Sequence, residues 1–245
     1  ADTSSLTKSI IAAATVFLPR EDVRKLFSDW IQEMRILTLV KLVDNKDAKV
    51  SKILDAVHKY TDVVGSDSND SITETWLIAE LAHRFLTSDD RLINLVLDNL
   101  NISDFESVLE KNIGSDTSSG RIGGKGAGLF IAKQILRHAS VEDPLLCDIK
   151  TPRTWYLAAD QIIDFLHYNN LEELNPYKYN SLFHLRITYD NVVSKIKSAK
   201  LPPQTVQMLH VVLDELGDVP LIVRSSSLLE DSPERAFSGK YKSLF

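Results

Sequence analysis

Apolar residues recur every three or four positions through the first 113 residues, which is the spacing of helices that bury one face. The clearest case is a face made by Val23, Phe27, Trp30, Met34 and Leu37. Further helices are predicted at residues 53–64, 72–86, 91–97 and 105–111. An apolar run at residues 10–18 is too short to span a bilayer, and we expect a buried helix there.

The breakers of secondary structure are distributed in agreement with this pattern. Residues 1–113 contain one glycine and one proline, Gly65 and Pro19, whereas residues 114–128 contain six of the nine glycines. The first region is therefore predicted to be all helical. Two of its helices carry the spacing of a capping box, and their residue pairs are Ser71 with Glu74 and Ser103 with Glu106.

From residue 114 the pattern changes to a mixture of helices and strands. A connector rich in serine at residues 115–120 is expected to be flexible. Helices are predicted at residues 125–138, 158–168, 184–199 and 203–216. Strands are predicted at residues 145–157, broken at Pro152, at residues 219–225, where a continuous apolar run indicates a central position, and at residues 241–245. The chain is thus predicted to be α+β.

A glycine-rich turn stands at the predicted start of a helix and reads Gly123-Gly124-Lys125-Gly126-Ala127-Gly128-Leu129. The paired glycines allow backbone angles forbidden to other residues, and a helix N-terminus with a lysine favours an anion. The turn matches neither the P-loop nor the dinucleotide fingerprint. A flexible interdomain turn and a phosphate-binding turn both remain open from these residues alone.

A second cationic element follows the apolar run Leu221-Ile222-Val223. Arg224 stands where that predicted strand ends, and Ser225, Ser226 and Ser227 add hydroxyl and backbone donors. Ligands of α/β folds bind at this edge of the sheet, and an arginine can donate two hydrogen bonds to one phosphate. The alternative is an ion pair between Arg224 and Glu230 or Asp231. Those two carboxylates are candidates either for a solvated structural role or for binding magnesium.

Composition narrows the classes of function. The 245 residues carry a formal net charge of -6, which argues against broad nucleic-acid binding. No membrane segment is predicted, and the expected location is the cytoplasm. The lone cysteine, Cys147, excludes an internal disulfide framework and is expected to be a small buried residue in a reducing compartment.

The order of these motifs resembles the pyruvate phosphate dikinase and phosphoenolpyruvate synthase family, in its N-terminal nucleotide-binding domain of ATP-grasp type. The resemblance covers roughly residues 120–245. It rests on the glycine-rich turn followed by Lys150-Thr151-Pro152, Ala159-Asp160, Phe165-Leu166, Val223-Arg224-Ser225-Ser226, Glu230-Asp231 and Phe237-Ser238-Gly239-Lys240-Tyr241. The implied organisation is a helical region of unknown role at residues 1–113, followed by a partial ATP-grasp-like α/β lobe at residues 114–245.

The resemblance also implies a site. Lys125 and Arg224 would contact the phosphates of ATP, with Gly124, Gly126, Ser225 and Ser226 beside them. Gly239 would belong to a loop on the phosphate side. No catalytic residue and no metal ligand is assigned within these 245 residues, because the family's carboxylate ligands for Mg²⁺ are expected in a second lobe beyond Phe245.

Two hypotheses about function follow. In the first, the chain is the N-terminal fragment of an ATP-dependent phosphotransferase that transfers phosphoryl through a phosphohistidine to pyruvate or a similar acceptor. The histidine would lie on a separate swivelling domain, since none of the six histidines stands in the family's threonine-histidine motif. The isolated fragment would then be inactive. In the second, the chain is a non-catalytic interaction or regulatory module with a degenerate nucleotide lobe, and its helical region is a candidate surface for a homodimer.

Overall fold

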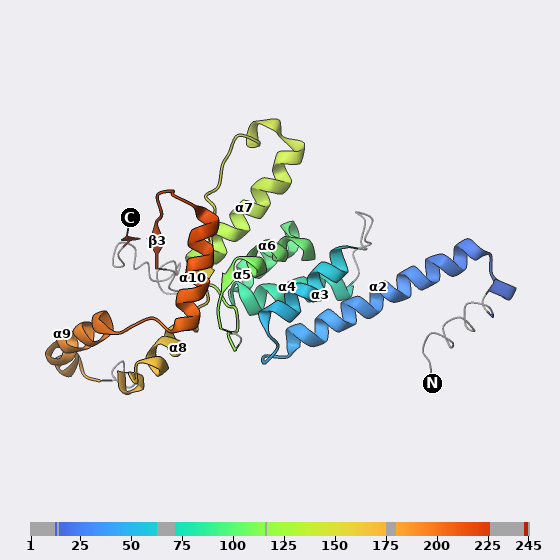
Figure 1. Cartoon of the computed structure of the whole chain (residues 1–245). Coiled ribbons are helices and arrows are strands. Elements are labelled where there is room, and N and C mark those ends of the chain that lie inside the picture. Colours follow the sequence, from blue (N-terminus) through green and yellow to red (C-terminus); the bar gives the residue numbers. More distant parts are fainter. Residues whose placement is uncertain are drawn as a thin grey trace.

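The computed structural model of the chain describes residues 13, 15–62, 72–115, 117–174, 180–225 and 243–244. Figure 1 shows helices joined by irregular segments. The described part of the chain contains four strands, each of two residues. The elements are α2 (Arg20–Asp44), α3 (Val50–Thr61), α4 (Ile72–Phe85), α5 (Asp90–Asn99), η1 (Ile102–Phe105), α6 (Glu106–Glu110), β1 (Asn112–Ile113), α7 (Gly124–Glu142), η2 (Pro144–Leu146), β2 (Tyr156–Leu157), α8 (Gln161–Tyr168), α9 (Leu182–Ser198), α10 (Pro203–Leu216), β3 (Val223–Arg224) and β4 (Ser243–Leu244).

Helices α2 to α6 pack together as the periodicity predicts, but α2 buries a different face from the predicted one. Its central and C-terminal part packs on α3 and α4 through Ile36, Leu39 and Val43. Of the predicted face, Val23 is buried, whereas Trp30, Met34 and Leu37 are exposed. The physical reason is that α2 is apolar on two sides, and its neighbours cover only one of them.

Arg84 of α4 caps the C-terminal end of α2. The guanidinium of Arg84 donates hydrogen bonds to four backbone carbonyls where α2 ends and α3 approaches, and it lies 5.4 Å from the ring of Phe85. The accepting carbonyls belong to Leu42, Val43, Asn45 and Ala48. Partial burial lowers the pKa of Arg84. The carbonyls that a helix end leaves without partners are satisfied here by one side chain.

The start of η1 corrects the predicted capping box. The box is formed by Asn101 and Asp104, whose side chains accept hydrogen bonds from each other's backbone N–H. Ser103, the predicted cap, instead donates its hydroxyl to the side chain of Asn101. The cap lies two residues earlier than predicted, at Asn101 in place of Ser103, because asparagine is itself a good N-cap residue. The other predicted box depends on Ser71, which lies outside the described residues.

A crossover unit joins the helical core to the rest of the chain. Strands β1 and β2 are parallel neighbours, with Asn112 opposite Tyr156, and α7 connects them. The strand predicted at residues 145–157 is reduced to β2, because η2 and an extended segment containing Pro152 occupy the remainder. Parallel strands require such a helical crossover, so the α+β class is confirmed.

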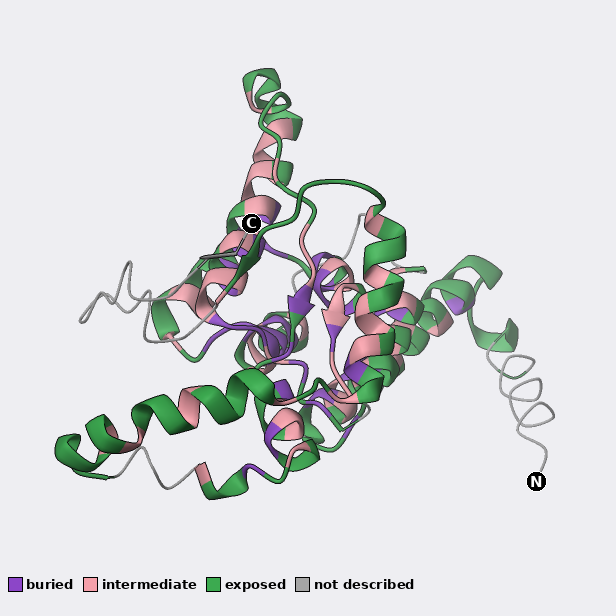
Figure 2. Cartoon of the chain, turned by 60° about the vertical axis from the view of Figure 1, so that its left-hand side comes forward, coloured by how far each residue is buried: buried purple, intermediate pink, exposed green. Residues whose placement is uncertain are grey.

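One apolar core includes residues from both sides of residue 114. Ile122, Phe130 and Tyr156 belong to the same buried cluster as Leu81 and Phe85 of α4. The rings of Phe105 and Phe130 lie 6.1 Å apart and join the two parts. Figure 2 shows this buried material at the centre of the molecule, whereas α9 is exposed over most of its surface. The segment after β1 is therefore packed directly onto the helical region.

The last helix agrees with the prediction and the strand after it does not. Helix α10 spans Pro203–Leu216, as predicted, and begins with Pro203 in its first turn. Strand β3 has two residues, pairs antiparallel with β4, and leaves Ile222 and Val223 exposed. The prediction of a central strand at residues 219–225 is therefore wrong, since no second layer covers this apolar run in the described part of the chain.

Two smaller predictions about burial are also wrong. Cys147 is exposed, and its thiol donates to the carbonyl of Ser140 at 3.4 Å. In the apolar run at residues 10–18, the described side chains of Val16 and Phe17 are exposed. None of the described helices is both long enough and apolar enough to cross a bilayer.

Candidate functional site

The structure places Lys125 in the first turn of α7. The helix begins at Gly124, its N-cap residue is Gly123, and its first backbone hydrogen bond runs from the N–H of Ala127 to the carbonyl of Gly123 at 2.9 Å. Gly123 has no side chain with which to cap the helix. The positive end of the helix dipole and the half-buried Lys125 therefore lie together, an arrangement that favours an anion.

The glycine with the unusual backbone is not one of the predicted pair. Gly123 has φ of -81°, whereas Gly120 has φ of +75°. A Cβ on Gly120 would lie 2.6 Å from Cγ2 of Val50 and 2.9 Å from Cε1 of Phe85. Gly120 thus provides both the left-handed turn and the close approach of the loop to the helical core. The paired glycines were expected to provide the turn, and that expectation is corrected.

The connector before α7 is tied down on its outer side. The carboxylate of Asp160 accepts a hydrogen bond from the hydroxyl of Ser118 at 2.7 Å and another from the N–H of Ser119 at 2.6 Å. Asp164 accepts one from the hydroxyl of Ser115 at 2.8 Å. Asp160 follows β2 and the loop follows β1. Because β1 and β2 are parallel, their carboxyl ends share one edge, which brings these groups together.

The same connector is also tied to the helical core. The N–H of Ile122 donates to the carbonyl of Phe85 at 2.9 Å, and the side chain of Arg121 donates to the hydroxyl of Ser88 at 2.7 Å. The carbonyl of Arg121 accepts from the N–H of Ala159 at 2.7 Å. Since both sides of the loop are held, the expected flexible connector is wrong for its described residues. The loop instead fixes the position of the first turn of α7.

Sequence reasoning did not assign this anchoring role. Asp160 was recognised as part of a motif and given no function, and Ser118 was assigned to a flexible segment. A signal was present, because serine hydroxyls and an aspartate at the carboxyl ends of two successive strands are typical of a fixed loop. Ser118 and Asp160 are 42 positions apart in the sequence, so their pairing becomes evident only from the parallel arrangement of β1 and β2.

Arg224 is the last residue of β3, as predicted for a cation at a strand end, and it is exposed. Ser225 follows it directly. Ser226 and Gly239, together with Glu230 and Asp231, lie outside the described residues. The main element contacts of α7 are with α5 and η2, and those of β3 are with β4. The convergence of Lys125 and Arg224 on one phosphate therefore stays a prediction.

Positive charge extends along α7 beyond Lys125. Burial lowers the pKa of Lys133, and the like charges of Lys111 and Arg137 lower it further. Arg137 also pairs with the buried carboxylate of Asp104, which lies 3.2 Å from Nε2 of His138. One buried carboxylate thus holds the C-terminal half of α7 against η1, so both halves of the helix are fixed.

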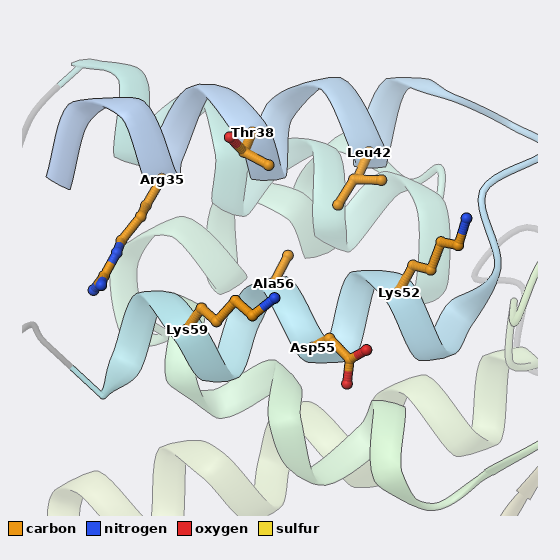
Figure 3. Close-up of a pocket in the computed structure, with 7 residues that line it drawn as sticks. All are labelled: Arg35, Thr38, Leu42, Lys52, Asp55, Ala56 and Lys59. Atoms are coloured by element: carbon orange, nitrogen blue, oxygen red, sulfur yellow. The ribbon is translucent and has the colours of Figure 1, made fainter. Parts of the chain in front are cut away.

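A separate groove lies between α2 and α3. Figure 3 shows its lining, in which Arg35, Thr38 and Leu42 come from α2 and Lys52, Asp55, Ala56 and Lys59 from α3. Its volume is about 390 Å³. The groove is open, and none of its residues was predicted as a site. Cations gather here on α2 and α3, whereas Lys125 is on α7 and Arg224 is on β3.

The described residues do not fit a magnesium site. No group of three or more histidine, cysteine, aspartate or glutamate side chains gathers in a metal-binding arrangement among them. Asp160 and Asp164 already accept hydrogen bonds from the connector. No step of the chemistry is therefore derived through a metal held by these residues.

Comparison with known proteins identifies the second half of the chain. The family model described as "Pyruvate phosphate dikinase, AMP/ATP-binding domain" matches residues 119–245, just over half of the sequence. The match begins within the anchored connector and includes the first turn of α7, β3 and β4. No curated protein and no solved structure matches the chain.

Proposed function

We propose, from the premise that this chain belongs to the family of the pyruvate phosphate dikinase AMP/ATP-binding domain, that it forms the ATP-binding part of a dikinase-like phosphotransferase. The nucleotide-binding portion would begin near residue 114 and extend through residue 245, as part of an ATP-grasp-like lobe. The observation that carries the proposal is the family match across the glycine-rich turn and the Arg224 strand. The expected location of such an ATP-dependent protein is the cytoplasm.

The proposed site binds the phosphates of ATP at the start of α7. The backbone of Gly124 and Gly126 would approach the phosphate oxygens at the positive end of the helix dipole. The Cβ position of Gly126 faces the ring of Tyr156, 3.2 Å away, so a glycine there also allows α7 to pack against Tyr156. Lys125 would supply a full positive charge. Arg224 would donate two hydrogen bonds from the end of β3, with Ser225, Ser226 and Gly239 beside it.

The chemistry expected of such a site is positioning and neutralisation of charge. Phosphoryl transfer spreads negative charge over the transferred group, and fixed cations stabilise that charge. In the proposed reaction, a histidine of a separate domain attacks phosphorus of ATP, an oxygen–phosphorus bond breaks, and the phosphohistidine then transfers its phosphoryl group to pyruvate or a similar acceptor. Mg²⁺ would accompany ATP, with its ligands outside the described residues.

Rigid support of the turn is the second argument for the site. The connector is held by Asp160 on one side and by Phe85 on the other. A loop fixed in this way positions Lys125 before the nucleotide arrives, so little ordering entropy is lost on binding.

The test is phosphohistidine formation from ATP by the whole natural protein. Lys125→Ala and Arg224→Ala should each reduce the rate by about 10²-fold or more, because each removes a cation from the phosphates. Lys133→Ala and Arg186→Ala are the matched controls, since they remove the same charges from α7 and α9 and should leave the rate unchanged. Unchanged phosphohistidine formation in both site variants would refute the proposal.

A further inference from the structure

Helix α2 carries apolar side chains on two sides. On the second side Val23 is buried, but the apolar residues from Leu26 to Leu37 on that side are largely uncovered. Ile36, Leu39 and Val43 are buried against α3 and α4. Leu26, Trp30, Met34 and Leu37 are between 41% and 56% exposed. At about 100° per residue, the centres of these two sets lie about 140° apart around the helix axis. A helix that is apolar on both sides is normally covered on both.

The exposed side continues onto α4. Leu37, Ile72 and Trp76 line one hollow of about 440 Å³, and Ile72 is 91% exposed. We call this surface the α2–α4 patch; it consists of Leu26, Trp30, Met34, Leu37, Ile72 and Trp76. In Figure 1 the N-terminal half of α2 projects beyond α3 and α4, and Figure 2 shows that half as largely exposed.

The size and composition of the patch are those of an interface. The patch holds six large apolar residues, each between 39% and 91% exposed, and a stable complex takes roughly 800 Å² of surface from each partner. Contiguous apolar patches above a few hundred Å² are rare on monomers. Tryptophan and methionine, which supply much of this area, are enriched at protein interfaces.

The charges beside the patch indicate which partner fits. On α2, Arg20 and Arg24 lie on one flank of the apolar side, and Asp22, Asp29 and Glu33 lie on the other. If two copies of α2 pair in parallel about a two-fold axis, the basic flank of each meets the acidic flank of the other. An antiparallel pair would bring Asp29 and Glu33 of one copy close to the same carboxylates of its mate.

The spacing along α2 favours the same arrangement. Phe27, Trp30, Met34 and Leu37 follow the three-and-four spacing of a coiled-coil seam, and the rings of Phe27 and Trp30 meet edge-on at 6.3 Å. The buried residues of α2 lie about 140° from this side around the helix axis, and α4 borders the seam where Ile72 and Trp76 line a hollow with Leu37. Two copies of α2 can therefore pair through the seam, with Ile72 and Trp76 at the edge of the contact.

We propose that the α2–α4 patch is the interface of a homodimer in which two copies of α2 pair side by side in parallel. The occupant of the patch is a second copy of this chain. The helical region then has a role of its own, which is to hold two nucleotide-binding portions in one particle.

Sedimentation equilibrium of the full chain tests the proposal. The wild type should have twice the 27.5 kDa mass of one chain, and Trp30→Glu and Leu37→Glu should each have the mass of one chain. Val141→Glu is the matched control, because Val141 is an exposed valine on α7, outside the patch, and this variant should stay dimeric. Circular dichroism establishes that each variant keeps its helices. A monomeric wild type, or a dimer unaffected by both patch substitutions, would overturn the proposal.

Disulfide trapping tests the direction of pairing. In a Cys147→Ser background, Leu37→Cys should form a disulfide-linked dimer on mild oxidation, since a parallel pair places each residue 37 opposite its mate. In an antiparallel pair centred on the patch, the two residues 37 would be about 16 Å apart along the axis and could not be linked. Val141→Cys is the control and should stay monomeric on a non-reducing gel. Failure of Leu37→Cys to cross-link in a dimeric protein would refute the parallel arrangement.

Discussion

Replacing Gly120 by alanine should destabilise the fold strongly, because this glycine combines a left-handed backbone with close contact. Its φ is +75°, and the added Cβ would lie 2.6 Å from Val50 and 2.9 Å from Phe85. A left-handed backbone costs a residue with a side chain about 1–2 kcal/mol. Overpacking against a buried ring costs about 1–3 kcal/mol more.

The two costs are partly offset in the unfolded chain. Alanine has less backbone freedom than glycine when unfolded, which contributes about 0.4–1 kcal/mol in favour of the variant. We therefore expect Gly120→Ala to lower the free energy of unfolding by about 2–4 kcal/mol. A typical domain has only about 5–15 kcal/mol in total, so the effect should be large.

Urea denaturation followed by circular dichroism measures this change, and Gly128→Ala is its control. Gly128 lies within α7, and a Cβ there would have no atom within 4 Å. Because alanine is the better helix former by about 0.8–1.0 kcal/mol, this variant should be more stable than the wild type. The two glycine-to-alanine changes should thus have opposite signs. A Gly120→Ala protein as stable as the wild type would refute the described path of the loop.

Three further predictions concern single side chains. Asp160→Ala should cost about 1–3 kcal/mol, because the hydroxyl of Ser118 and the N–H of Ser119 both lose their acceptor. Hydrogen exchange at the N–H of Ser119 should become faster, and unchanged exchange would contradict the anchoring. Arg84→Met should lower the free energy of unfolding by about 2–3 kcal/mol, since the carbonyls at the end of α2 lose a charged donor. Urea denaturation measures this change, and an unaltered midpoint would refute the capping role of Arg84. Burial raises the pKa of Tyr156 from 10.0 to about 12, so its contribution to stability is complete below pH 10 and is lost as the pH rises to about 12. Over that range the wild type should lose more unfolding free energy than Tyr156→Phe, and parallel curves would contradict the burial of the hydroxyl.

Local patterns in the sequence predicted the helices well and their partners poorly. Residues 203–216 form α10 because a proline starts the helix and a glycine follows it, and both signals are local. The buried face of α2 was missed because both of its sides are apolar, and the positions of α3 and α4 decide which one is covered. The run Leu221-Ile222-Val223 has the composition of a central strand, but only pairing with strands on both sides would make it one.

The same distinction between local signals and contacts of distant residues applies to the candidate site. The position of Lys125 at the start of a helix was predictable, because the adjacent glycines are a local signal in the sequence. The loop that supports it depends on Asp160 and Phe85, which are distant in sequence. Composition gives no information on such pairings, and they became visible only when β1 and β2 were placed as parallel neighbours.

The central claim is that the first turn of α7 holds the phosphates of ATP. The most direct test is the equilibrium dissociation constant for ATP of the whole natural protein, measured by calorimetry for the wild type, Lys125→Gln and Lys133→Gln. The two lysines lie about 12 Å apart on one helix, so the variants differ in whether the first turn or the middle of α7 loses a charge. We expect Lys125→Gln to weaken ATP binding by about tenfold or more, the equivalent of about 1.4 kcal/mol, and Lys133→Gln to bind as the wild type does. Equal affinities of the wild type and Lys125→Gln would contradict the claim.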